Sequence, residues 1–280
     1  MPLSSLRDYL RRALAEDVAW GDVTTQALVP DTVAASGQIV AREPGVIAGL
    51  PVAREAFTLV DERLQFAQVV PDGALIQPGA VVATIDGPAA GLLTAERVAL
   101  NYLQRLSGIA TLTRRYVQAI AGTTARLVDT RKTTPGLRSL EKYAVRCGGA
   151  GNHRFGLSDG VLIKDNHIAI LARQGIPLRD VVARARAGVA HSLRIEVEVD
   201  GIDQIEEALA GGADVILLDN MSPTILAAAV RQIAGRALTE ASGGITLDNV
   251  RACAEAGVDL ISVGALTHSV PALDLGLDIA

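Results

Sequence analysis

The first hundred residues alternate between two hydrophobic periods, one typical of helices and the other of strands. Apolar residues three and four apart predict an amphipathic helix over residues 3–16, and a second apolar face predicts a helix over residues 52–60. Short strands are expected over residues 38–42, 64–70 and 80–85, between turns that contain proline or glycine. We therefore predict an antiparallel sheet with helices packed on it.

A longer helical pattern runs over residues 93–121, with apolar positions that include Leu100, Leu103 and Leu106. Gly108 is expected to interrupt this helix, because glycine is unfavourable in a helix interior. Arg105 lies just before that expected break. It is therefore either a surface residue or a residue that reaches into a neighbouring site.

After residue 121, short β-branched apolar runs alternate with helical patterns. The expected strands cover residues 126–129, 160–164, 193–199, 214–218, 237–241 and 259–263. The expected helices cover residues 166–173, 178–187, 201–210, 222–233 and 246–256. This alternation is typical of a parallel α/β sheet, and we predict that the sheet is closed or nearly closed as a barrel. Six strands are visible, fewer than the eight of a full (β/α)8 barrel.

The composition is that of a folded globular protein, with 280 residues of which 49% are hydrophobic and 20% charged. This length suits one barrel-sized unit and a smaller second domain. The longest apolar runs are interrupted within about ten residues, too few for a transmembrane helix. The first twenty residues lack the apolar core of a secretory signal. Two cysteines without metal-like spacing favour a reducing, cytoplasmic location.

Positive charge is concentrated in residues 128–168, although the chain as a whole has a formal charge of −5. The stretch carries seven cationic side chains against four carboxylates, a net charge of +3, and two of the four histidines. A local concentration of positive charge in an acidic protein indicates a pocket for a small, highly anionic ligand. Nucleic acid would instead require a basic surface. The alternative is a set of solvated surface charges.

Polar or glycine residues stand at the end of each expected strand of the second region. Catalytic groups of such barrels lie at the carboxyl ends of the strands, so these residues form a candidate site. Helix capping is the structural alternative for Asn166, Asn220 and Ser242. The strand-end segments are Asp129-Thr130-Arg131-Lys132, Lys164-Asp165-Asn166-His167, Glu196 with Glu198, Asp219-Asn220, Ser242-Gly243-Gly244 and Val263-Gly264-Ala265.

Two of these features suit a phosphorylated sugar. The glycine turns after the last two strands allow backbone N–H groups to approach a phosphate. Glu196 and Glu198 alternate along one strand and point the same way, and Glu198 lies nearer the strand end. With Asp219, Glu198 could hold a ribose diol directly or through Mg²⁺. Salt-bridged structural acids are the alternative.

The longest of these motifs resemble the signature of the quinolinate phosphoribosyltransferase family. The likeness covers nearly the whole chain in order. The segments that carry it are Gly21–Thr25, Glu96–Asn101, Arg105–Thr111, Asp129–Arg138, Gly151–Arg154, Lys164–His167, Glu196–Asp200, Leu218–Asn220, Glu240–Ile245 and Ser262–Ser269.

The resemblance implies an α/β fold, with an N-terminal α/β sandwich domain over residues 1–110. An open seven-stranded α/β barrel would follow over residues 111–280, with the last helix packed back on the N-terminal domain. The family acts as a homodimer, and the sequence leaves a hexamer open. The implied reaction converts quinolinate and phosphoribosyl pyrophosphate to nicotinate mononucleotide, pyrophosphate and CO2 with Mg²⁺, in de novo NAD biosynthesis.

The resemblance also assigns roles to individual residues. Arg131, His153, Arg154 and Lys164 would bind the two carboxylates of quinolinate, and Arg105 would reach the same pocket from the partner subunit. Lys132, Glu198 and Asp219 would be the catalytic residues at the pyrophosphate, ribose and metal end, with Thr130 beside them. The backbone of Ser242, Gly243 and Gly244 and that of Val263, Gly264 and Ala265 would hold the 5′-phosphate.

Two other functions remain possible from the sequence. One is an enzyme on the same scaffold with a single-carboxylate substrate, such as a nicotinate phosphoribosyltransferase, or the paralogue associated with molybdate transport. Such a substrate would need fewer cations than the five assigned to quinolinate. The other is a catalytically silent sensor that binds the phosphorylated sugar and releases no CO2.

Overall fold

The computed structural model describes residues 3–279, which form two compact units. The first unit takes in the chain up to Arg114, the segment Pro135–Gly149 and the chain from Ser269 onward. The second consists of Arg115–Thr134 and Ala150–His268. The second unit therefore contains all six strand ends of the candidate site.

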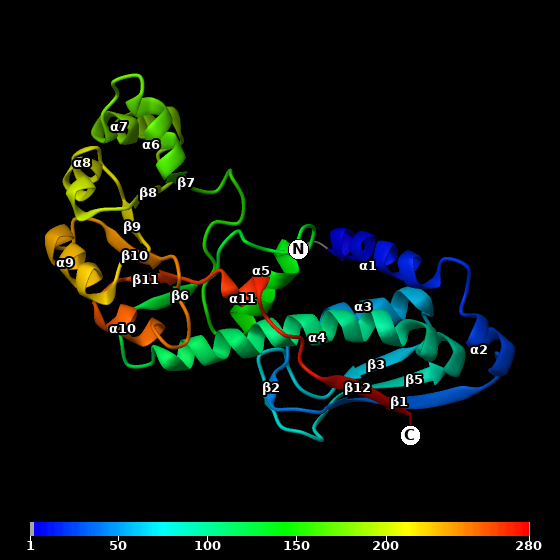
Figure 1. Cartoon of the computed structure of the whole chain (residues 1–280). Helices are drawn as coiled ribbons and strands as arrows, with labels where there is room; N and C mark the ends of the chain where they lie inside the picture. The colour runs from blue at the N-terminus through cyan, green and yellow to red at the C-terminus, as the bar shows by residue number, and fades with distance from the viewer. Residues whose placement is uncertain (1–2, 280) are drawn as a thin grey trace. The chain divides into compact units, whose positions relative to one another are not determined.

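The first unit is built on a four-stranded antiparallel sheet in the order β12-β1-β5-β3 (Figure 1). These strands are β1 (Ala34–Ala41), β3 (Gln65–Gln68), β5 (Val81–Pro88) and β12 (Leu275–Ile279), and a separate pair is formed by β2 (Gly45–Val46) and β4 (Leu75–Ile76). The helices are α1 (Leu3–Val18), α2 (Val23–Leu28), α3 (Leu50–Val60), α4 (Ala89–Ala119) and α5 (Arg138–Cys147). The antiparallel sheet with helices predicted from the sequence is confirmed.

The core of this unit lies between the sheet and the apolar faces of α3 and α4. On α4 the buried positions recur every three or four residues, among them Ala95, Ala99 and Leu103, which is the spacing of one helix face. Phe57 of α3 and Phe66 of β3 pack with ring centroids 6.0 Å apart. Apolar periodicity thus positions α4, which carries Arg105.

Gly108 does not break α4, so the interruption expected from the sequence is wrong. The helix is continuous from Ala89 to Ala119. A Cβ on Gly108 would collide with the carbonyl oxygen of Pro271, which belongs to the same unit. The glycine therefore serves the close approach of another backbone segment and not a bend.

The described chain returns to the first unit as a strand and not as the expected helix. Strand β12 pairs antiparallel with β1 from Gly37↔Ile279 to Ala41↔Leu275. Another element, α2, was not predicted from the sequence. Asp22 caps this helix, because its side chain accepts hydrogen bonds from the backbone N–H and the hydroxyl of Thr25.

The second unit is built on a six-stranded parallel sheet in the order β6-β11-β10-β9-β8-β7, with helices along its outer face (Figure 1). Its strands are β6 (Arg126–Val128), β7 (Val161–Ile163), β8 (Ile195–Val199), β9 (Val215–Asp219), β10 (Leu238–Ser242) and β11 (Leu260–Ser262). Its helices are α6 (Asp165–Ala172), α7 (Leu178–Gly188), η1 (Ile202–Gln204), α8 (Ile205–Ala210), α9 (Pro223–Ile233), α10 (Val250–Glu255) and α11 (Ala265–His268).

The sheet is open, because within residues 3–279 its edge strands β6 and β7 do not pair with each other. All six strands read from the apolar runs are present. The seventh strand implied by the family resemblance is not in this sheet, where residue Gly151 contributes only a single parallel bridge to Val128. In the part of the chain that the structure describes, no helix has the length and apolar character needed to cross a membrane.

Candidate active site

The carboxyl ends of the parallel strands carry the side chains singled out from the sequence. Asp129 follows β6, Lys164 follows β7 and Asp219 ends β9. Ser242 ends β10 and Val263 follows β11. Because the carboxyl ends of parallel strands meet at one edge, these residues share one rim of the second unit.

The segment after β6 holds the backbone of Lys132 on both sides. The Lys132 N–H donates to Thr130 Oγ1 over 3.0 Å, and the buried Thr267 hydroxyl donates to the Lys132 carbonyl oxygen over 2.7 Å. The Lys132 side chain itself is exposed. A fixed backbone under an exposed ammonium group suits a residue that contacts an anion arriving from solution.

Asp129 anchors the next segment of the site to the end of β6. Its carboxylate is fully buried and accepts hydrogen bonds from Asn152 Nδ2 (2.8 Å) and the His153 backbone N–H (2.9 Å). The Gly151 N–H donates to the carbonyl oxygen of Leu127 over 2.9 Å. These bonds hold the loop that carries His153, so that the residue lies against the inner face of the sheet.

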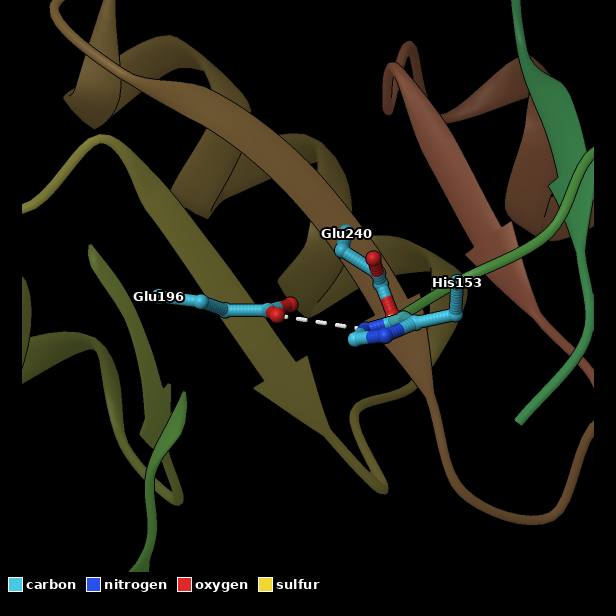
Figure 2. Close-up of side chains that lie close together, drawn as sticks. All are labelled: His153, Glu196 and Glu240. Atoms are coloured by element: carbon cyan, nitrogen blue, oxygen red, sulfur yellow. Dashed lines mark ion pairs between the residues drawn. The ribbon is translucent and has the colours of Figure 1, made fainter. Parts of the chain in front are cut away.

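His153 lies between two buried carboxylates that come from two different strands. Figure 2 shows the ring pointing toward Glu196 of β8 and Glu240 of β10. His153 Nε2 lies 3.1 Å from Glu196 Oε2 and 3.4 Å from Glu240 Oε1. On the other side of the ring, the Arg154 backbone N–H donates to His153 Nδ1 over 2.7 Å. Both nitrogens of the ring are therefore engaged.

The two carboxylates determine the charge of His153. Burial lowers the pKa of His153, but its interactions with the acceptor carboxylates of Glu196 and Glu240 raise it more, to about 10. The Arg154 N–H opposes this, because a backbone N–H can donate only to an unprotonated Nδ1. The contacts with two carboxylates favour the cationic ring, and in that form the Arg154 bond to Nδ1 would be lost. Burial also raises the pKa of Glu196, with repulsion from Glu240 adding to it.

The ligand atoms of His153, Glu196 and Glu240 lie within 4.8 Å of one another, close enough to surround a metal ion. The hydrogen-bond pattern argues against that use. Whether neutral or cationic, His153 carries a proton on Nε2, because Nδ1 accepts from Arg154 in the neutral form. The ring nitrogen that faces the carboxylates then has no lone pair for a metal.

A second acid–base pair links β7 and β8. Lys164 Nζ lies 2.5 Å from Glu198 Oε2, where Glu198 is buried and Lys164 is about half exposed. Glu196 and Glu198 lie on the same side of β8, as the alternation predicts, and both have partners in the site. The side chain of Glu196, which the sequence left open, thus belongs to the cluster around His153.

The arginines of the site lie close enough to repel one another. Burial lowers the pKa of Arg154, and repulsion from Arg131 lowers it further, against the opposing attraction of Glu196, Asp159 and Glu198. Arg154 Nη1 also donates to the Gly160 carbonyl oxygen over 3.3 Å. A pair of neighbouring guanidinium groups in a partly buried position favours a ligand with more than one negative charge.

Asp219 is oriented by the residue after it. Asn220 Nδ2 donates to Asp219 Oδ2 over 2.6 Å, and the Asn220 N–H donates to the Ser242 carbonyl oxygen over 2.9 Å. Asn220 has a left-handed backbone with φ of 53°. A side chain on Gly243 would collide with Asn220, so the glycine turn after β10 makes room for this arrangement.

The capping alternatives are not the ones that the structure uses. Ser222 caps α9, because its Oγ accepts from the Ile225 N–H, whereas Asn220 lies before the cap. Asn166 lies inside α6. His167 is the capping side chain there, since its Nδ1 accepts from the Lys164 N–H over 2.9 Å. The second histidine of the cationic stretch is therefore structural.

Not all of the cationic stretch belongs to the second unit. Helix α5, with Arg138, Lys142 and Arg146, is grouped with the first unit, as is Arg105. Arg105 Nη2 lies 3.0 Å from the fully buried Glu141, and Arg105 Nη1 donates to the Val270 carbonyl oxygen over 3.1 Å. The second unit brings together Arg131, Lys132, His153, Arg154 and Lys164.

Glu240 is the site residue that the sequence reasoning missed. It lies inside a strand, whereas the candidates predicted from the sequence stand at strand ends. Its signal was its position two residues before Ser242, which places both side chains on one face of β10.

Comparison with known proteins agrees with the motif resemblance. The chain matches the N-terminal domain of quinolinate phosphoribosyl transferases over residues 22–107 and the C-terminal domain over residues 109–278. It is 48% identical to nicotinate-nucleotide pyrophosphorylase [carboxylating] of Mycobacterium leprae, covering 98% of this chain and 96% of the relative. A Bacillus subtilis protein with the same name, qualified as probable, is 45% identical, over 98% of this chain and 93% of the relative.

A solved structure is similar over the whole length. The crystal structure of NadC from Streptococcus pyogenes has a TM-score of 0.94 and 42% identity, covering 100% of this chain and 99% of that one. Both domain matches and the full-length relatives point the same way. The chain therefore belongs to the quinolinate phosphoribosyltransferase family.

Proposed function

We propose that the protein transfers the phosphoribosyl group of phosphoribosyl pyrophosphate to quinolinate with decarboxylation. The products are nicotinate mononucleotide, pyrophosphate and CO2, and the activity is that of a pentosyltransferase (EC 2.4.2.19) of de novo NAD biosynthesis. The observation that carries this proposal is the full-length likeness to relatives named for this activity.

The dicarboxylate would bind where the cations of the second unit gather. Arg131 and Arg154 are suited to planar carboxylates, because a guanidinium group offers paired donors that a lysine lacks. His153 and Lys164 would complete the set, and Arg105 of the partner subunit would reach the same pocket. Lys164 would then exchange part of its contact with Glu198 for the ligand.

The phosphoribosyl end would lie along the other strand ends. Lys132 and Thr130 would hold the pyrophosphate, and Glu198 and Asp219 the ribose. The 5′-phosphate would be held by the backbone of Ser242–Gly244 and Val263–Ala265. Gly243 and Gly244 have positive φ, at 82° and 60°, which turns the chain back at this rim.

The residues at this end are of the type that would hold a magnesium ion. Glu198 and Asp219 offer carboxylate oxygens, which are the ligands that Mg²⁺ prefers in proteins. Each carboxylate has one oxygen held by a neighbour, Lys164 or Asn220, which fixes its orientation. When bound, directly or through water, the ion would supply charge neutralisation for the departing pyrophosphate.

The side chains would contribute mainly by positioning and by charge. The pyridine nitrogen must approach C1 of the ribose as pyrophosphate leaves. Holding both substrates in line would therefore lower the activation barrier of the transfer. Glu198 and Asp219 would offset the positive charge that develops at C1. Loss of CO2 then leaves negative charge on the ring carbon, which Arg131, His153 and Arg154 would stabilise.

We propose a homodimer in the cytoplasm, and the sequence leaves open whether such dimers assemble into a hexamer. The absence of a membrane-spanning helix among the described residues is compatible with this location. We also propose a domain boundary between residues 110 and 111. The two family matches meet nearby, since one ends at residue 107 and the other begins at residue 109.

Pyrophosphate and CO2 release test the proposal directly. The protein is supplied with Mg²⁺, phosphoribosyl pyrophosphate and either quinolinate or nicotinate. We expect both products with quinolinate and little pyrophosphate with nicotinate. Pyrophosphate release with nicotinate alone would favour the single-carboxylate enzyme, and binding of the phosphorylated sugar without product would favour the sensor.

A further inference from the structure

The acids around His153 are outside the set of residues assigned to either substrate. We propose that Glu240, together with Glu196, is a positioning residue that fixes the orientation and charge of His153 for contact with the dicarboxylate. The inference rests on the proposed function and adds a layer of residues beneath the substrate contacts.

The pairing of the strands fixes the face of the sheet on which Glu240 lies. Leu217 of β9 pairs with Glu198 on one side and with Glu240 on the other. Paired residues of parallel strands point to the same face, so Glu198 and Glu240 project into the same interior two strands apart. Glu240 is 1% exposed and Glu196 is 7% exposed. The two acids are thus fixed by strand backbone and not by loops.

His153 is held at both of its ends. Asp129 accepts a hydrogen bond from its backbone N–H, and Glu196 and Glu240 hold Nε2 of the ring. The Nδ1 edge is bonded to the Arg154 peptide N–H, which an anionic ligand would displace. An anionic ligand at that edge would meet Nδ1–H of the cationic ring. The acids therefore determine which edge of His153 is presented.

The remaining atoms of the acids support a role directed at the ring. Within the described chain, Glu196 Oε1 is buried without a hydrogen-bond partner, and Glu240 Oε1 has His153 Nε2 as its ionic neighbour at 3.4 Å. Purely structural buried acids are usually saturated with hydrogen bonds, because an unsatisfied buried oxygen is unfavourable. Leaving Glu196 Oε1 unsatisfied is unfavourable for folding, and a function at His153 explains it.

Charge gives the same result. Glu196 from β8 and Glu240 from β10 face the His153 ring, whereas Asp129 after β6 accepts from the His153 backbone N–H and the Arg154 backbone N–H donates to Nδ1. Burial opposes a positive ring, and the two carboxylates outweigh it. Removing one carboxylate should therefore make the ring easier to deprotonate and weaken its contact with an anion.

Kinetics of Glu240→Gln provide the first test, since glutamine keeps the shape and removes the charge. We expect the KM for quinolinate to rise about ten-fold, with the KM for phosphoribosyl pyrophosphate within about two-fold of wild type. Glu55→Gln is the matched control. Glu55 is also a buried acid with a cationic partner, Arg7, but it lies in the first unit, and its loss should leave both KM values unchanged.

Histidine NMR provides the second test and needs no substrate. The chain has four histidines, so His153→Gln identifies the His153 signal by its loss. In the ligand-free wild type we expect this ring to remain cationic above pH 8, since its pKa is raised to about 10. In Glu240→Gln the midpoint should fall by about one pH unit or more.

A His153 titration that is the same in wild type and Glu240→Gln, with an unchanged KM for quinolinate, would overturn the inference. If Glu240→Gln does not fold, Glu240→Asp replaces it, because the shorter acid should shift the same two measurements in the same direction. Failure of the wild type to convert quinolinate would instead count against the proposed function. The NMR comparison would still decide whether the acids control His153.

Discussion

Asn220 donates its side-chain amide to Asp219 Oδ2 over 2.6 Å while its own backbone is in the left-handed region, with φ of 53°. A left-handed backbone is unfavourable for a residue with a side chain. Ala234, at the end of α9, is the other such residue described, with φ of 50°. The strained backbone at Asn220 therefore accompanies the orientation of a candidate catalytic carboxylate. The strained backbone at Ala234 only ends a helix.

We predict that substitution by glycine impairs catalysis at Asn220 and leaves it unchanged at Ala234. Both Asn220→Gly and Ala234→Gly relieve a positive φ, so stability should change little or rise, by up to about 1 kcal/mol. Asn220→Gly also removes the bond to Asp219, and the KM for phosphoribosyl pyrophosphate should rise about ten-fold. Steady-state kinetics and thermal melts check both. Equal kinetics for the two variants would show that Asn220 serves the turn alone.

Lys132→Ala should abolish most activity without loss of fold. The bonds of Lys132 to Thr130 and Thr267 are made by its backbone, so they survive truncation of the exposed side chain. We expect kcat to fall about 100-fold or more, with a melting temperature within about 2 °C of wild type. A melting temperature that falls in step with activity would identify Lys132 as structural.

Glu198→Ala should likewise affect turnover far more than stability. Its partner Lys164 is about half exposed, so water can solvate the ammonium group when the carboxylate is removed. The free energy of unfolding should change by about 1 kcal/mol or less, while kcat falls about 100-fold. Denaturant titration beside steady-state kinetics measures both. If Glu198 binds the metal, Glu198→Gln should also require more Mg²⁺ for half-maximal rate.

Gly108→Ala should destabilise the protein although it lies in a helix interior, where alanine is usually better by about 1 kcal/mol. The added Cβ would meet the Pro271 carbonyl oxygen, so helix α4 or the Pro271 segment must move. Gly188→Ala is the control, because Gly188 ends α7 with open space around it. We expect a lower melting temperature for the first and an equal or higher one for the second. A stabilised Gly108→Ala would exclude the close approach.

Mixed dimers test whether Arg105 acts in the partner's site. Arg105→Ala protein and Lys132→Ala protein should each be nearly inactive. After subunit exchange, one site in a mixed dimer would have both residues intact, and activity should return to about a quarter of wild type if subunits mix at random. Continued inactivity after verified exchange would place Arg105 in the site of its own chain, or in a structural role with Glu141.

The strands of the second unit could be predicted because each is a short, buried apolar run bounded by polar or glycine residues. The site rim followed, since residues at the carboxyl ends of parallel strands must converge. Lys164, Asp219 and Ser242 all lie at such ends. Local pattern and sheet geometry were sufficient for this part.

What could not be predicted depends on contacts between distant segments. Gly108 reads as a helix breaker because its reason, the Pro271 carbonyl, is 163 positions further along the chain. Glu240 reads as an ordinary strand residue until His153 is brought against it from a loop. The cationic stretch of residues 128–168 is likewise divided between the two units by contacts with distant segments. Helix α5 belongs to the first unit, and the segments on either side of it belong to the second.

The pairing of β12 with β1 has a consequence for how the molecule is made. The edge of β1 that β12 covers stays bare until Leu275–Ile279 has been synthesised, which is after every other described element. A nascent chain that already contains the complete catalytic rim would still expose an unpaired strand edge, which is a surface prone to association with other chains. Synthesis of β12, and not that of the parallel sheet, is then the step that completes the first sheet.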